Sequence, residues 1–192
     1  MSIELAFISI DDYNKKDPTI KKWNGIDYPK EYLESIKRTN WLSKIAPNAS
    51  DALKIATRSQ HIGRWEIPRD TYESSRIGYL TWRSDLAKYH ARKTSEILQK
   101  LNFDTNTIAR VQELNLKKGI KTDADAQTIE DVLCLVFLEN HIDDFAPSQD
   151  EEVLSNIIQK TWKKMSDLGR AEALKISYKP EILAFLKTAL SL

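Results

Sequence analysis

Residues 124–141, ADAQTIEDVLCLVFLENH, form the most apolar helical stretch of this 192-residue chain, and the run VLCLVFL within it contains only apolar side chains. Thr122 and Asp125 have the spacing of a capping box, in which two polar side chains close the first turn of a helix. We therefore expect a helix from Ala124 to His141. Because a helix that is apolar on most of its surface must be covered by other elements, we expect it to be buried.

The segments on both sides of this stretch also follow helical spacing. Apolar residues three and four positions apart, separated by prolines and capping residues, predict helices. The expected helices cover residues 3–14, 29–47, 51 to about 65, about 79–101, 104 to about 119, 148 to about 165, 166 to about 176 and 181–190. Residues 3–14 also fit a short strand, although the helix is favoured. With no strand alternation and no internal repeat, the sequence predicts an all-α fold.

The length of the chain suits a single domain. We expect one globular bundle of about seven to nine helices spanning residues 1–192. Within it, residues 1–47 would supply N-terminal helices, 48–145 the core that bears the site, and 146–192 the helices that cover this core.

Composition limits the classes of function. With 41% hydrophobic and 30% charged residues and a net charge of +1, the chain is an ordinary globular protein and is unsuited to coating DNA or an anionic membrane. A single cysteine, Cys134, excludes an internal disulfide framework and cysteine-rich zinc sites. The N-terminal sequence does not have the order of charges of a signal peptide, and no apolar run is long enough to span a membrane. We therefore expect a cytoplasmic protein.

Basic and aromatic residues are concentrated between Arg58 and Lys93. This stretch carries a net charge of +4, so the rest of the chain carries −3. It includes a segment bracketed by Pro68 and Gly78 that is expected to be a long loop, and long loops in compact domains are commonly functional. Because the planar guanidinium group holds phosphate or carboxylate with two hydrogen bonds, the arginines predict a small anionic or phosphorylated ligand. The candidate ligand-binding residues are Arg58, Arg64, Arg69, Arg76, Arg83, Trp65 and Trp82.

A solvated basic face would also account for this stretch. On a helix from Asp51 to Trp65, the residues Arg58, His61 and Trp65 would stand in one column, which is compatible with full exposure to water. The two tryptophans would either stack on a base or pack the loop against the protein.

Two histidines and several acids suggest a metal site. His61 and His90 are expected on helices joined by one loop, where they would face each other, and neutral imidazoles bind zinc, manganese or iron. Asp131 and Glu139 on the apolar helix are the candidate acidic ligands, and magnesium is a further candidate metal. Glu130 or Asp131 would act as the general base. His90 also fits a histidine buried in the core. Glu130 and Asp131 also fit the first turn of a helix, where the helix dipole favours acidic side chains.

Four longer runs carry a family resemblance: SQHIGRWEIPR (59–69), RIGYLTWRSDLAKYHA (76–91), QTIEDVLCLVFLEN (127–140) and KTWKKMSDLGRAEAL (160–174). They resemble, over nearly the whole chain, the helical family catalogued as domain of unknown function 4202.

A more distant resemblance is to the metal-dependent phosphohydrolases of the histidine-aspartate superfamily, which are all-helical. It implies that His61 matches the first histidine of that pattern, His90 the histidine of the His-Asp doublet and Glu139 the final acid. Asp131 stands where the buried helix usually begins with a glutamate. The chain departs from the pattern at Ala91, where the aspartate of the doublet is expected, so Asp85, Asp131 or a water would have to complete the coordination.

Two functional hypotheses follow. In the first, a divalent metal activates water for hydrolysis of a small phosphorylated substrate such as a nucleotide, and the arginines hold the phosphate. In the second, the same arginines form a non-catalytic module that binds a phosphate-bearing ligand or an RNA end, with His61 and His90 as hydrogen-bonding groups. A purely structural role is the third alternative.

Overall fold

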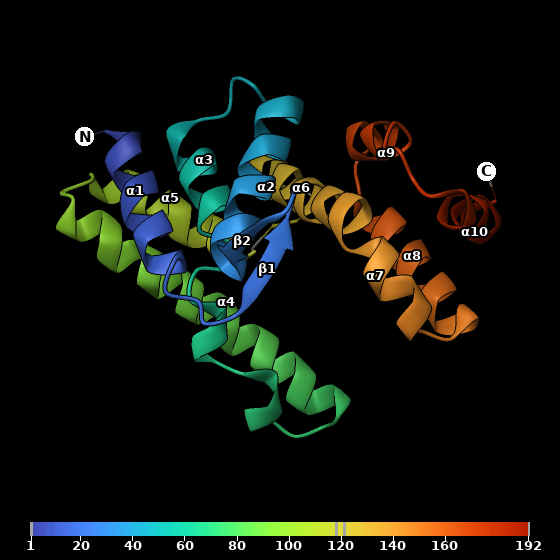
Figure 1. Ribbon diagram of the computed structural model, residues 1–192. Coiled ribbons are helices and arrows are strands. Elements are labelled where there is room, and N and C mark those ends of the chain that lie inside the picture. The colour runs from blue at the N-terminus through green and yellow to red at the C-terminus, as the bar shows by residue number, and fades with distance from the viewer. Residues whose placement is uncertain (1, 118, 121, 192) are drawn as a thin grey trace.

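The computed structural model describes residues 2–117, 119–120 and 122–191, and it confirms the all-α prediction (Figure 1). The α-helices of this part of the chain are α1 (Ile3–Asn14), α2 (Lys30–Ile45), α3 (Asp51–Arg58), α4 (Arg76–Lys100), α5 (Thr105–Asn115), α6 (Ala124–Asn140), α7 (Ile142–Phe145), α8 (Glu151–Lys164), α9 (Asp167–Ala173) and α10 (Pro180–Leu190). Short 3-10 helices are η1 (Arg64–Glu66), η2 (Arg69–Thr71) and η3 (Ala146–Ser148). The helix α7 is a single turn.

The apolar helix α6 lies at the centre of the bundle, as its sequence predicts. It packs against α2 on one side and against α8 and α9 on others. Ile129, Val132 and Leu135 are almost completely buried in a core cluster that draws residues from α1 through α10. No described helix is long and apolar enough to cross a membrane. The cap is one residue later than expected, because the carboxylate of Asp123 accepts the backbone N–H groups of the first turn.

Local capping residues set several other helix starts. Ser50 accepts the N–H of Leu53, Asp104 accepts that of Thr107, and Ser166 accepts that of Gly169. Each side chain satisfies a backbone donor that the helix itself leaves free. These starts are the ones that the sequence predicts.

A β-hairpin precedes α2, although the sequence was expected to contain no strand. The strands β1 (Ile20–Trp23) and β2 (Ile26–Pro29) pair antiparallel, with Trp23 opposite Ile26. Asn24 and Gly25 form the turn with φ angles of 50° and 80°. This left-handed conformation is the one that Asn-Gly favours in a two-residue hairpin loop. Strands of four residues with little alternation give no clear periodic pattern, so the sequence does not predict them.

Helix α3 is shorter than predicted, and this changes the geometry of the basic stretch. It ends at Arg58, and Gly63 then turns the chain with a φ of 66°. A side chain on Gly63 would approach the rings of Tyr13 and Tyr89 to 2.9 Å, so glycine is required. His61 and Trp65 therefore do not continue the helical column that begins at Arg58.

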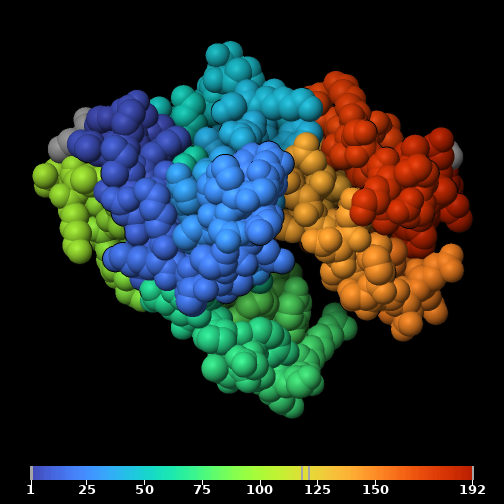
Figure 2. Space-filling view, in the orientation of Figure 1, coloured from blue at the N-terminus to red at the C-terminus, as the bar shows by residue number. Residues whose placement is uncertain are grey.

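The loop before α4 is also shorter than expected, because α4 begins at Arg76 and η1 and η2 occupy much of the segment. The start of α4 projects from the body of the molecule, and the surface is hollowed between it and the region of α8 (Figure 2). This hollow leads to the candidate site.

Candidate functional site

A cavity of about 590 Å³ opens between α2, α4 and α6, with further walls from the hairpin, the segment after α3, and α8. Its walls carry seven cationic side chains against three acidic ones, Glu31, Glu34 and Glu130. The cationic residues are Lys21, Lys30, Arg38, Arg64, Arg83, Lys117 and Lys164. A concave site with an excess of one charge attracts ligands of the opposite charge, so the cavity favours anions.

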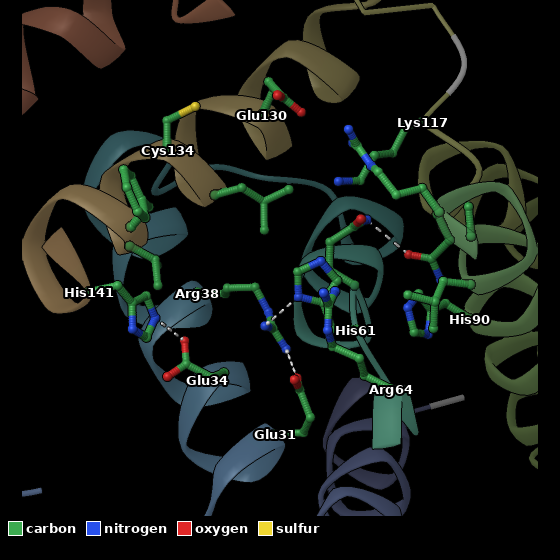
Figure 3. A pocket seen from close by; sticks show the side chains of 18 of the residues that line it. Glu31, Glu34, Arg38, His61, Arg64, His90, Lys117, Glu130, Cys134 and His141 are labelled. Carbon is green, nitrogen blue, oxygen red and sulfur yellow. Dashed lines mark hydrogen bonds and ion pairs between the residues drawn. The ribbon is translucent and has the colours of Figure 1, made fainter. Parts of the chain in front are cut away.

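Arg38 occupies the middle of this site (Figure 3). It extends from α2 and is 2% exposed. Its Nη1 lies 3.4 Å from Nδ1 of His61, and its Nη2 lies 3.7 Å from Oε2 of Glu31. Burial lowers the pKa of Arg38 and raises that of Glu31, although each charge partly offsets the shift of the other. Nε and Nη2 of Arg38 have no hydrogen-bond acceptor among the described residues.

The two predicted histidines meet in the cavity wall, with ring centroids 5.7 Å apart. Nδ1 of His90 donates to the carbonyl of Ile62 at 2.8 Å, which leaves Nε2 as an acceptor. No partner for that atom occurs in the part of the chain that the structure describes. Burial lowers the pKa of His90 to about 3 and that of His61 well below its ordinary value, and nearby cations reinforce both shifts. Both imidazoles are therefore neutral acceptors and donors.

A buried amide pair supports the same wall. Gln60 Nε2 donates to Asn115 Oδ1 at 3.2 Å, and Asn115 Nδ2 donates to Ser59 and Thr94. These bonds hold the orientation of Gln60, whose Oε1 is buried without a donor among the described side chains.

Lys117 approaches the cavity from the end of α5. Its backbone is left-handed, with a φ of 55°, which is uncommon for a residue other than glycine or asparagine. Burial lowers the pKa of Lys117 to about 8; Glu130 opposes this shift, and Arg83, Lys164 and Arg64 add to it. Its amine thus loses its proton more easily than that of an exposed lysine.

Three of the predicted ligand-binding residues line the cavity: Arg64, Arg83 and Trp82. The guanidinium of Arg64 lies 4.8 Å from the ring centroid of Trp82, and that of Arg83 lies 5.7 Å from the ring of Tyr79. Trp82 is held in place because its Nε1 donates to the carbonyl of Ile67 at 2.9 Å.

The structure places the other four elsewhere. Arg58 forms a two-bonded ion pair with Asp11 on α1, at 2.8 and 2.6 Å. Arg69 donates to the carbonyls of Tyr72 and Glu73 and so braces the loop before α4. Arg76 is exposed at the start of α4, and the ring of Trp65 packs 5.9 Å from that of Tyr13. None of these four side chains lines the cavity.

Of the three predicted acids, Glu130 lines the cavity and the other two lie outside it. Glu130 lines the cavity and lies 3.4 Å from Lys164. Asp131, its neighbour, faces α9 instead, where Oδ1 accepts the N–H of Ser166 at 2.8 Å. Glu139 is exposed and accepts the indole N–H of Trp41 at 2.7 Å.

The structure brings only two of the four predicted metal ligands together. His61 and His90 lie together, but Asp131 and Glu139 are engaged by Ser166 and Trp41. Across residues 2–117, 119–120 and 122–191, no group of three His, Cys, Asp or Glu side chains is arranged to hold a metal ion.

Sequence reasoning did not single out Arg38, Glu31 or Glu34 as site residues. They lie three and four positions apart on α2, a spacing that usually indicates ion pairs on an exposed helix face. They are buried because α2 packs against α6 and α3.

Comparison with known proteins gives one finding. Residues 4–186 match the model of the family described as a domain of unknown function (DUF4202). No curated protein and no solved structure matches the chain, so the resemblance to the histidine-aspartate superfamily is without support from these comparisons.

Proposed function

This chain belongs to the DUF4202 family, and we propose that its central cavity binds a small phosphorylated compound that also carries hydroxyl groups, such as a mononucleotide or a sugar phosphate. The ligand's phosphate would lie among the arginines and lysines. Its hydroxyl groups would face the neutral acceptors of the same wall.

One observation carries this proposal. Four residues that line the cavity hold five buried polar atoms without a hydrogen-bond partner among the described residues. They are Glu31 Oε2, Arg38 Nε, Arg38 Nη2, Gln60 Oε1 and His90 Nε2. Glu31 Oε2 and Arg38 Nη2 form an ion pair at 3.7 Å, which is too long for a hydrogen bond. Each of the other atoms is an unpaired buried polar group, which costs about 1–3 kcal/mol. A cavity wall with several such groups is suited to a polar ligand that supplies the missing partners.

The charge of the wall supports a phosphate. Seven cationic side chains face three carboxylates. The two buried histidines, His61 and His90, are neutral and add no charge, so the excess of four positive charges counts lysine and arginine only. Arg38 and Arg64 present planar guanidinium groups, which match the geometry of phosphate oxygens. The volume of about 590 Å³ lies in the range of small-molecule sites.

The hydrogen-bond acceptors of the cavity wall that have no donor among the described residues favour a ligand with hydroxyl groups. His90 Nε2 and Gln60 Oε1 both require a donor, which a fully ionised phosphate does not have. A sugar hydroxyl supplies one. Trp82 and Tyr79, each next to an arginine, offer aromatic faces for a base.

Metal-dependent hydrolysis is the less well supported alternative, because the described residues do not gather the ligands that it needs. An RNA end carries the same chemistry as a mononucleotide. The small ligand is favoured because the net charge of the whole chain is only +1, whereas polymer binding generally uses an extended basic surface.

The proposal is tested by isothermal titration calorimetry with inorganic phosphate, ribose 5-phosphate, adenosine 5′-monophosphate and a 5′-phosphorylated oligonucleotide. We expect the two sugar-containing compounds to bind more tightly than inorganic phosphate. In Arg64→Ala their dissociation constants should rise by about tenfold to a hundredfold, the effect of losing a charge-assisted hydrogen bond.

The matched control is Arg76→Ala, which removes the same charge from an exposed position outside the cavity. Its binding should match that of the wild type. Absence of binding by all four compounds, or equal losses in the two variants, would contradict the proposal. Tighter binding of the oligonucleotide than of the monophosphate would favour the RNA end.

A further inference from the structure

Glu34 and His141 form a carboxylate–imidazole pair in the cavity wall, and the proposed binding of a phosphorylated ligand does not require this pair. Oε2 of Glu34 lies 2.9 Å from Nε2 of His141. Glu34 comes from α2 and His141 follows the last residue of α6, and both line the cavity. Figure 3 shows the two side chains pointing toward each other.

Glu34 is held as an ionised acceptor. It is 7% exposed, and its second oxygen lies 3.4 Å from Nζ of Lys37. Burial alone would raise the pKa of Glu34, but the hydrogen bond and charge of His141, with Lys37 and Arg38, lower it to about 2. An ionised carboxylate only accepts, so Nε2 of His141 donates to it.

In the neutral form of the imidazole, this hydrogen bond determines which nitrogen is basic. With the proton on Nε2, the lone pair is on Nδ1. No hydrogen bond to Nδ1 of His141 is found within the described part of the chain, and the side chain is 39% exposed. The basic nitrogen is thus accessible to water beside a cationic cavity.

We propose that His141, oriented by Glu34, is the general base in the hydrolysis of a phosphate ester held in this cavity. This inference rests on the proposed binding of a phosphorylated ligand. It assigns His141 as a catalytic residue and Glu34 as a positioning residue.

The reaction needs only water and the ester. A water oxygen attacks phosphorus as Nδ1 of His141 takes one of its protons, so an O–P bond forms. The P–O bond to the alcohol breaks on the opposite side of phosphorus. The departing oxygen takes a proton from solvent water, and the imidazolium returns its proton to solvent. Arg38 and Arg64, from the same wall, would neutralise the charge that develops on the phosphoryl oxygens.

A purely structural role is less able to account for the pair. Glu139, two residues before His141, already fastens the end of α6 to α2 through the indole N–H of Trp41 at 2.7 Å. The helix junction therefore retains a contact without His141.

The test measures release of p-nitrophenol from p-nitrophenyl phosphate and bis(p-nitrophenyl) phosphate, with binding of inorganic phosphate measured in parallel. We expect His141→Gln to lower kcat by at least about a hundredfold with unchanged phosphate binding, because glutamine can still donate to Glu34 but cannot accept the proton. Glu34→Gln should lower kcat by about tenfold. Added imidazole should restore part of the rate in His141→Ala.

Asp143→Asn is the control, since Asp143 lies two residues from His141 but pairs with Lys179 outside the cavity. Its rate should equal that of the wild type. A wild type that binds phosphate yet releases no p-nitrophenol would overturn this inference and leave the binding function standing, whereas absence of binding would overturn both. Activity that persists in His141→Gln, or a loss in His141→Ala that imidazole does not restore, would assign the pair a structural role only.

Discussion

Nη1 of Arg38 lies 3.4 Å from Nδ1 of His61, at the centre of the cavity. A guanidinium group only donates hydrogen bonds, so Nδ1 accepts and the proton of His61 is on Nε2. Burial, followed by the charges of Arg38 and Arg64, lowers the pKa of His61 well below its ordinary value. Because this histidine is neutral, an anionic ligand must be attracted by the arginines and lysines around it.

The pairing of Arg38 with Glu31 leads to a first prediction. Glu31→Gln removes a buried carboxylate 3.7 Å from the guanidinium. We expect phosphorylated ligands to bind more tightly, by about threefold to tenfold, because Arg38 is no longer partly neutralised. The free energy of unfolding should fall by about 3 kcal/mol, because the buried cation loses its partner. Urea denaturation with and without ligand measures both effects, and Glu152→Gln, at an exposed position on α8, should change neither.

The lowered pKa of Lys117 gives a second prediction. Between about pH 8 and 10.5 the unfolded chain holds a proton at this residue that the folded protein has lost, so the contribution of Lys117 to stability increases as the pH rises through this window. Ligand affinity should change in the opposite direction, because the ammonium that attracts phosphate disappears above about pH 8. Titrations at several pH values should show this decline in the wild type and a smaller one in Lys117→Met. Equal declines in the two proteins would show that Lys117 takes no part in binding.

Glu130 and Asp131 are adjacent but face different surroundings, which gives a third prediction. Asp131→Ala removes the acceptor for the N–H and hydroxyl of Ser166 at the start of α9, so unfolding should become easier by about 2–3 kcal/mol. Ligand binding should stay within about twofold of the wild type. Glu130→Gln should instead alter binding, because Glu130 lines the cavity next to Lys164. If Asp131→Ala weakens ligand binding and Glu130→Gln does not, Asp131 would be a site residue.

A fourth prediction concerns metals. Protein purified without chelator or nickel resin should contain much less than one equivalent of zinc, manganese or iron by elemental analysis. His61→Ala and His90→Ala should not change that content, because the candidate acids Asp131 and Glu139 are bonded to Ser166 and Trp41. One equivalent of metal in the wild type that is lost in both variants would instead support the metal-dependent hydrolase.

Features that depend on neighbouring residues could be predicted from the sequence. The apolar helix α6 and the helix starts at Ser50, Asp104 and Ser166 follow from periodicity and capping, which act over a few residues. The Asn24-Gly25 turn has the same local origin, but the strands that it joins are too short to give a periodic pattern.

The sequence by itself therefore determined an all-α fold around a buried apolar helix and a basic stretch next to two histidines. Only the tertiary structure decided which of those side chains meet. Arg58 pairs with Asp11, 47 positions away, and therefore does not line the cavity. Glu34 bonds to His141, 107 positions away, and Arg38 is buried in the same cavity wall. The partner of a long charged side chain is chosen by the packing of distant helices, and this information is not contained in the spacing of residues along one helix.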